Sequence, residues 1–239
     1  MLHPLYLIYM IQKITPAEPI RFAILAADTA LFTVREGELL VRLIKIERPP
    51  FYTNTIGLPG GLLDPKENAE QAAQRHTENK AGIAASKVYA EQLYTFSDID
   101  RDPRGRVVAV AYLALVPWEK LSPEEQNGTK EVWWAPAKKA GKLAYDHDEV
   151  LLMAIERLRS RITYTTLLSK LMPKEFTLTE LENAYEGILG RQLDKRNFRK
   201  KILKLKMVVP AKGKRTGGRF RPAQLYRFAS DEVKGMEVL

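Results

Sequence analysis

The sequence predicts an α+β protein with two domains, a sheet-containing domain followed by a smaller, basic and largely helical domain. The chain has 239 residues, which favours two domains over one or three. Apolar runs typical of strands occur in the first half, whereas apolar positions at helical spacing follow residue 148. Residues 151–239 contain 20 Lys and Arg against 9 Asp and Glu, compared with 18 against 20 in residues 1–150. We therefore expect domains at residues 1–146 and 147–239.

The first domain is predicted to contain a β-hairpin, two further strands and one helix. Two apolar runs in residues 21–47 surround the turn sequence Arg35-Glu36-Gly37-Glu38, which is typical of a hairpin. Residues 106–117 form a third, β-branched run, and residues 131–134 form a shorter fourth run. Residues 67–81 are rich in Ala, Glu and Gln, which predicts a helix between strands.

Composition excludes several kinds of site. The chain has no cysteine, which rules out disulfides, thiolate metal sites and a cysteine nucleophile, and which fits the reducing cytoplasm. The apolar stretch Leu5–Ile11 is too short to span a bilayer, so we expect a strand or helix of the first domain there and no membrane partner. His3, His76 and His147 are far apart in the sequence, and they predict neither a metal site nor a catalytic pair.

The second domain is predicted to be three helices followed by a hairpin. Apolar spacing predicts a connecting helix over residues 148–162. A second helix begins at a cap, either Thr177 or Thr179, and ends at Gly190. A third helix begins after Asp194 and runs to about Leu205, and residues 207–228 form a hairpin with a basic tip.

The third helix of this domain has one apolar face and one cationic face. Phe198, Ile202 and Leu205 fall on a narrow stripe. The cations that lie roughly opposite are Arg196, Arg199, Lys200 and Lys204. Residues 191–221 contain 13 Lys and Arg against a single acid, Asp194. Two helices joined by a short turn and followed by a hairpin predict a winged helix-turn-helix that binds double-stranded DNA, and the narrow apolar stripe argues against a membrane surface.

The residues expected to contact DNA lie on the second and third helices and on the wing. They are Thr179, Lys195, Arg196, Asn197, Arg199, Lys200, Lys214, Arg215, Arg219 and Arg221. Asn197 is the candidate for reading a base edge, since Asn makes bidentate hydrogen bonds to adenine. Arg219, on the wing, is expected to meet phosphate.

A phosphate-handling motif occurs in the first domain. Gly61, Glu67, Arg75, Gly82 and Ile83 stand at the spacing of the Nudix box, which the segment after Leu58-Pro59-Gly60 therefore resembles. In that motif a loop, a helix and a loop aim carboxylates at divalent metal ions that hold a pyrophosphate. The resemblance implies a Nudix α/β/α sandwich with a mixed sheet.

The carboxylates of the motif are missing here. The three glutamate positions on one helical face are occupied by His76, Asn79 and Lys80, and a lysine ammonium repels the metal ion that a glutamate would hold. We therefore expect no metal and no catalytic residue. Two interpretations of Lys80 remain open: it replaces part of the charge of the metal against a diphosphate, or it points to solvent as most helix lysines do.

A second segment, FSDIDRDPRGR at residues 96–106, resembles the ADP-ribose-handling branch of the Nudix proteins. Arg101 and Arg104 flank a turn there and could present guanidinium groups to phosphate or ribose, although a solvated surface turn is the alternative. The expected ligand-binding residues are Gly60, Gly61, Glu67, Arg75, Lys80, Arg101 and Arg104.

Longer segments resemble one regulator family. The sequence YDHDE from Tyr145, the run from Arg161 to Leu203, and RPAQLYRF from Arg221 are similar to the Nudix-related transcriptional regulators of the NrtR family. The resemblance implies a homodimer that represses NAD-biosynthesis genes and releases operator DNA when it binds ADP-ribose or a related NAD derivative.

Other functions remain as alternatives. A sister branch of the same architecture governs sugar catabolism, and a residual ADP-ribose pyrophosphatase would need the glutamate cluster that is absent. An RNA-binding module would explain the basic second domain but not the preserved phosphate loop.

Overall fold

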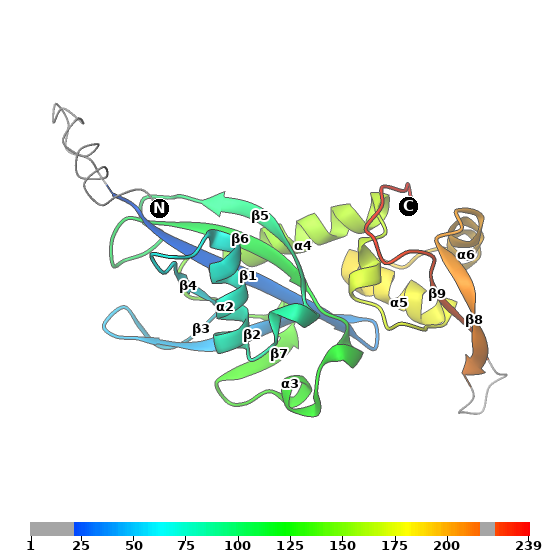
Figure 1. The fold of residues 1–239 in the computed structure, drawn as a ribbon, viewed down its shortest axis with the longest axis horizontal. Coiled ribbons are helices and arrows are strands. Elements are labelled where there is room, and N and C mark those ends of the chain that lie inside the picture. Colours follow the sequence, from blue (N-terminus) through cyan, green and yellow to red (C-terminus); the bar gives the residue numbers. More distant parts are fainter. Residues whose placement is uncertain (1–21, 216–222) are drawn as a thin grey trace.

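A computed structural model describes residues 22–215 and 223–239, and it confirms the α+β class (Figure 1). The first domain contains β1 (Ile24–Arg35), β2 (Glu38–Arg48), β3 (Tyr52–Gly57), β4 (Gly60–Leu62), α2 (Ala69–Ala81), β5 (Tyr89–Phe96), β6 (Val107–Leu115), α3 (Pro123–Asn127) and β7 (Val132–Pro136). The remaining elements are α4 (His147–Tyr164), α5 (Leu178–Leu189), α6 (Lys195–Lys204), β8 (Val208–Arg215) and β9 (Ala223–Phe228). The expected element at Leu5–Ile11 lies outside the described residues.

The sheet is mixed and lies between helices. Its main path is β3-β2-β1-β6-β5, with β4 paired to β1 and β7 paired to β2. Among the described strands of this sheet, only the central β1–β6 pair is parallel, and the other pairs are antiparallel. On β1, Ala30 and Phe32 belong to the core that includes α4, whereas Ala27 and Leu31 belong to cores that include α2 and its C-cap region. This alternation places α2 and α4 on opposite faces, which gives the expected α/β/α sandwich.

Local signals fix the ends of the helices. Asn68 caps α2 in a capping box with Gln71, so the helix starts two residues later than the composition predicted. Thr177 is the cap of α5, which decides between the two threonines, and Gly190 ends this helix with a φ of 73°. Asp194 caps α6 by accepting a hydrogen bond from the backbone N–H of Asn197 at 2.8 Å.

The second domain packs its helices and hairpin around aromatic side chains. The ring of Phe176 lies 5.1 Å from that of Phe228, and the ring of Tyr185 lies 5.2 Å from that of Phe198. Phe198 and Ile202 are buried, as the helical wheel predicted. The β8–β9 hairpin follows α6, so the predicted helix-turn-helix and wing are confirmed.

A single hydrophobic core runs from the first domain into the second. It includes Phe32 and Leu43 on the sheet, Leu158 on α4, and Tyr185 and Phe198 in the second domain. The connecting helix α4 therefore packs on both parts (Figure 1). None of the helices in residues 22–215 and 223–239 is both long and apolar enough to cross a membrane.

Candidate ligand cavity and nucleic-acid interface

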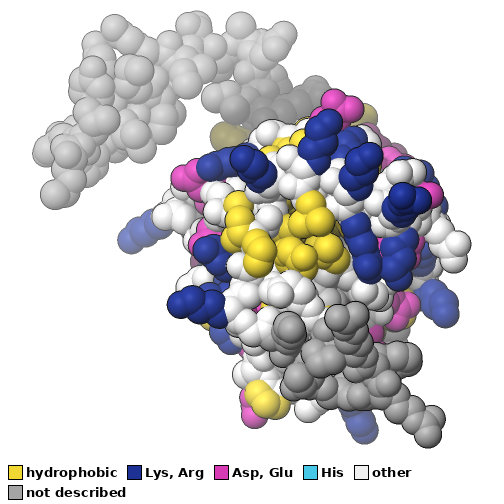
Figure 2. Space-filling view, turned by 90° about the vertical axis from the view of Figure 1, so that its right-hand side faces the viewer, with side chains coloured by type: hydrophobic (Ala, Val, Ile, Leu, Met, Phe, Trp, Pro, Cys, Tyr) yellow, Lys and Arg dark blue, Asp and Glu magenta, His cyan; other side chains and the backbone are white. Residues whose placement is uncertain are grey.

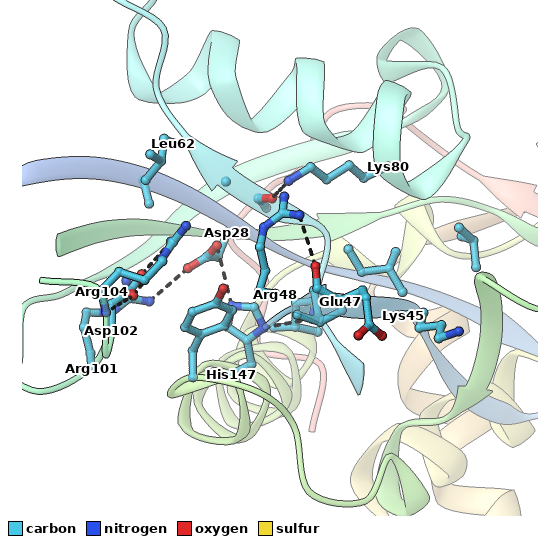
Figure 3. Close-up of a pocket in the computed structure, with 18 of the residues that line it drawn as sticks. Asp28, Lys45, Glu47, Arg48, Leu62, Lys80, Arg101, Asp102, Arg104 and His147 are labelled. Atoms are coloured by element: carbon cyan, nitrogen blue, oxygen red, sulfur yellow. Dashed lines mark hydrogen bonds and ion pairs between the residues drawn. The ribbon is translucent and has the colours of Figure 1, made fainter. Parts of the chain in front are cut away.

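A cavity of about 350 Å³ opens beside the sheet, where β2 ends and α4 begins (Figure 3). Its walls are Ala26, Asp28, Ile44, Lys45, Ile46, Glu47, Arg48, Leu58, Gly60, Gly61, Leu62, Lys80, Arg101, Asp102, Arg104, Glu131, Val132, Tyr145 and His147. The volume is within the range of small-molecule sites, and both apolar and charged side chains contribute to it.

A buried polar network forms one wall of the cavity. A terminal nitrogen of Arg101 lies 3.0 Å from the Asp28 carboxylate and 2.7 Å from that of Asp146. His147 accepts a hydrogen bond from the backbone N–H of Leu58 at 2.9 Å and lies 3.6 Å from Asp28. Burial alone would raise the pKa of Asp28, but His147 and Arg101 lower it below its usual value. This wall of the cavity is therefore a buried network of hydrogen bonds and ion pairs.

Arg104 lies in the same cavity but is paired differently from Arg101. Its guanidinium makes hydrogen bonds of 2.9 and 2.6 Å to Asp102 and lies 5.7 Å from the centre of the Tyr145 ring. Arg101 and Arg104 thus both line the cavity, and both are also paired with carboxylates of the protein. Their contact with a ligand stays a prediction.

Two glycines keep the floor of the cavity open. A Cβ on Gly60 would overlap the Asp28 carboxylate and approach the Ala27 carbonyl oxygen to 2.8 Å. A Cβ on Gly61 would lie 2.7 Å from the His76 ring and 2.8 Å from Lys80 Nζ. Backbone and cation can approach each other here only because neither residue has a side chain.

Glu67 and Arg75 are not among the residues that line this cavity. They pair with each other, with Arg75 Nε 2.9 Å from a Glu67 oxygen, and Arg75 also donates to the Leu62 carbonyl at 3.1 Å. Hydrogen bonds from Arg75 and from the backbone of Asp64 lower the pKa of Glu67 to about 2. In this structure the pair holds the loop before α2, and ligand binding by either residue stays a prediction.

The three positions that replace the glutamates have different surroundings. His76 is buried, its Nε2 lies 3.1 Å from the Leu62 carbonyl oxygen, and burial lowers its pKa. Asn79 is exposed. Lys80 lines the cavity and donates a hydrogen bond to the Gly60 carbonyl oxygen, so its side chain points into the cavity rather than to bulk solvent. Its contact with a diphosphate stays a prediction.

These residues do not fit the magnesium site that the Nudix box would build. Mg²⁺ needs several oxygen ligands, whereas at one of the motif's glutamate positions the cavity has the ammonium of Lys80. Within residues 22–215 and 223–239 we find no cluster of three metal-ligating His, Asp or Glu side chains.

The cationic face of α6 is exposed at the far end of the molecule. Lys195, Arg196, Asn197 and Lys200 are all exposed. Seen from this end, Lys and Arg side chains lie above and on either side of a small hydrophobic patch (Figure 2). An exposed helix face with several cations is typical of a surface that binds the DNA backbone and groove.

Arg199 has a different position from its neighbours on α6. It is half-buried and donates hydrogen bonds to the Thr179 hydroxyl at 2.8 Å and to the buried Glu182 carboxylate at 3.1 Å. The helical wheel placed Arg199 among the cations opposite the apolar stripe, but it could not show the acid on α5 that pairs with it. Arg199 and Thr179 join α6 to α5 in this structure.

Comparisons with known proteins match both parts of the chain. The Nudix domain model matches residues 25–153, and the NrtR DNA-binding winged helix domain model matches residues 168–228. A protein described as the ADPR-responsive transcriptional repressor NtrR of Acinetobacter baylyi is 37% identical over 210 residues, which cover 86% of this chain and 82% of the relative. The chain belongs to the NrtR family.

Solved structures of this family agree with the fold. Shewanella oneidensis NrtR complexed with a 27mer DNA matches with a TM-score of 0.74 and 32% identity, over 85% of this chain and 93% of that chain. The Nudix domain of the same NrtR, crystallised with ADP-ribose, matches with a TM-score of 0.50 and 28% identity, over 63% of this chain and 97% of that chain. The expected architecture, a Nudix domain followed by a winged helix, is therefore that of an NrtR protein.

Some cavity residues of this NrtR-family chain escaped sequence reasoning. Arg48, Asp28 and Tyr145 line the cavity, yet no motif marks the first two. Tyr145 and His147 belong to the YDHDE segment, which served only as a family resemblance and could have indicated a site. Tyr145 has a φ of 57°, an unusual conformation for a non-glycine residue next to a cavity.

The wing of the NrtR domain is described only in part. The backbone of Lys214 and Arg215 belongs to β8, and nothing is described of their side chains. Arg219 and Arg221 lie outside the described residues. Their contacts with DNA stay predictions.

Proposed function

We propose that this chain is a repressor of NAD-metabolism genes that binds operator DNA through α6 and the wing and senses ADP-ribose, or a related NAD derivative, in the cavity beside β2. The observation that carries the proposal is that one chain holds both a charged cavity and an exposed cationic recognition helix, connected by α4. The family supports it, since one relative is named as ADPR-responsive and another was solved with DNA.

The two functions divide along the chain. Residues 1–146 form the sensing domain, and residues 147–239 form the connector and the DNA-binding domain. On α6, Lys195, Arg196, Asn197 and Lys200 contact the operator, because their side chains are exposed. Arg199 and Thr179 act through the packing of α6 on α5.

The protein works without hydrolysing its effector. The pyrophosphatase reaction needs bound metal to make a nucleophile from water, and His76, Asn79 and Lys80 do not supply carboxylates for it. We propose further that it acts in the cytoplasm as a homodimer, because a two-fold protein matches two operator half-sites.

The test of this function is release of DNA by the effector. A fluorescent duplex, selected from a random library by the protein itself, would be bound in the absence of ADP-ribose and followed by anisotropy as ADP-ribose is added. We expect the anisotropy to fall as the duplex is released, since effectors of this kind change affinity by about 5- to 150-fold. AMP and ribose 5-phosphate serve as controls, each of which lacks the diphosphate.

Two outcomes of this titration would contradict the proposal. Selection of no DNA at all would remove the repressor function. Release by a free sugar and not by ADP-ribose would favour the alternative, a regulator of sugar catabolism.

A further inference from the structure

The charges that line the cavity are unevenly paired. Arg101 is paired with Asp28 and Asp146, Arg104 with Asp102, and Lys45 lies 3.6 Å from Glu131. Two more cations, Lys80 and Arg48, line the same cavity, as does the carboxylate of Glu47, which accepts a hydrogen bond from the backbone N–H of Asn54 at 2.9 Å. Across residues 22–215 and 223–239, neither of them has a carboxylate within ion-pair distance.

These two unpaired cations come from different elements and meet at one place. Lys80, in the last turn of α2, is held by the Gly60 carbonyl oxygen above the open floor at Gly61. Arg48, at the end of β2, donates to the Glu47 carbonyl oxygen at 3.2 Å and extends toward the Lys80 ammonium (Figure 3). Burial, and then the charge of Arg48, lower the pKa of Lys80. An anion bound between these two cations would reduce the electrostatic repulsion between them.

We propose that Lys80 and Arg48 together hold the diphosphate of the effector, so that this protein binds it without a divalent metal ion. The inference rests on the proposed function for the identity of the ligand. A diphosphate diester carries about two negative charges, which two cations balance. The same two charges would oppose the entry of Mg²⁺ into the cavity.

The test is calorimetric titration of the full-length protein with ADP-ribose, once in EDTA and once with Mg²⁺. We expect the same Kd in both. Lys80→Gln and Arg48→Gln should each weaken binding by about 10- to 100-fold, as expected for the loss of one charge-assisted hydrogen bond. Lys66→Gln is the matched control, since Lys66 is exposed on the loop before α2 and lies outside the cavity.

The outcomes separate this inference from the proposed function. If wild-type protein does not bind ADP-ribose in either buffer, the effector assignment is wrong. If it binds only with Mg²⁺, or if both variants bind like wild type, the metal-free diphosphate site is wrong. Arg48 is exposed, so its variant remains informative even if replacing the half-buried Lys80 lowers the yield of folded protein.

A second inference comes from a separate contact between the two domains. The turn between β1 and β2 lies against α5, and a Cβ on Gly187 would overlap the carbonyl oxygen of Gly37. Nearby, Arg159 on α4 donates to the Ile188 carbonyl oxygen of α5 at 2.9 Å. Thus the turn between β1 and β2 and helix α4 both contact α5, and α5 in turn packs against α6.

Strand β2 and helix α4 each also reach the cavity, at the end of the element that is far from α5. β2 runs from the turn to Arg48, and α4 begins at His147, and both of these residues line the cavity. We infer that β2 and α4 transmit effector binding to α5, and that the close contact of Gly37 with Gly187 is required for this coupling. Arg199 of α6, which donates a hydrogen bond to Glu182 of α5, would then couple a displacement of α5 to α6.

The variant Gly187→Ala tests whether the close contact of Gly37 with Gly187 is required for this coupling. Alanine favours a helix over glycine, so a defect would come from displacement of the turn rather than from α5 itself. We expect the variant to bind ADP-ribose with wild-type affinity, while the factor by which ADP-ribose weakens DNA binding falls toward one. Arg159→Gln should reduce this factor as well. Gly235→Ala is the matched control, because a Cβ there meets no atom within 4 Å.

This route of transmission would be excluded if Gly187→Ala and Arg159→Gln both folded and if ADP-ribose weakened DNA binding by the wild-type factor in both variants. A wild-type protein that shows no coupling would instead contradict the proposed function.

Discussion

Replacing Arg196 and Lys200 with alanine should weaken operator binding by about 100-fold or more near physiological salt, since each contact of such a cation with base or phosphate contributes about 1–3 kcal/mol. Both side chains are exposed on α6. We expect an unchanged melting temperature. A plot of the logarithm of the operator affinity against the logarithm of the salt concentration should also be less steep, with a slope smaller in magnitude by up to about two. Anisotropy titrations over a series of salt concentrations measure both quantities.

A matched control removes the same charge elsewhere. Lys66→Ala with Lys142→Ala neutralises two exposed cations of the first domain. It should leave the operator affinity close to that of wild type. If the α6 variant bound like this control, α6 would not be the recognition helix.

Arg199→Ala should behave differently from both, because it leaves the buried Glu182 carboxylate unpaired and should lower the melting temperature together with DNA affinity.

The second large effect is the absence of turnover. ADP-ribose incubated with this protein and Mg²⁺ or Mn²⁺ should give no AMP and ribose 5-phosphate above the rate without protein, whereas enzymes accelerate such reactions by about a millionfold or more. The physical reason is that His76, Asn79 and Lys80 supply no carboxylate for metal. Chromatographic separation of the nucleotides measures the products, with an active ADP-ribose pyrophosphatase as positive control.

Turnover at an ordinary enzymatic rate would contradict this interpretation of the degenerate box. Restoring glutamate at all three positions should not create activity by itself. The buried His76 is bonded to the Leu62 carbonyl oxygen, so its replacement would also disturb β4.

Much of the fold could be predicted because local physics decides it. The turn at Glu36-Gly37 needs positive φ at both residues, and the glycine marks it in the sequence. The stripe of Phe198 and Ile202 predicts which face of α6 is buried, and tertiary packing agrees. Strand β5 was not predicted, because only two of its eight residues are buried and its apolar alternation is weak.

The spaced motif predicted part of the candidate cavity. Gly60, Gly61 and Lys80, in or beside the degenerate box, line it, whereas Glu67 and Arg75 of the same box do not. Arg48 and Asp28 could not be predicted, since only the sheet brings them beside residues distant in the chain. For the same reason the wheel of α6 showed the charge of Arg199 but not the carboxylate of Glu182 that binds it.

The central claim is that one molecule couples effector and operator, and calorimetry tests it most directly. ADP-ribose is titrated into the protein alone and into the protein saturated with operator duplex. Linkage requires the operator to weaken ADP-ribose binding by the same factor by which ADP-ribose weakens operator binding, and we expect a factor of about 5 to 150. Identical ADP-ribose affinities in the two titrations would mean that this cavity is not the sensor of the repressor.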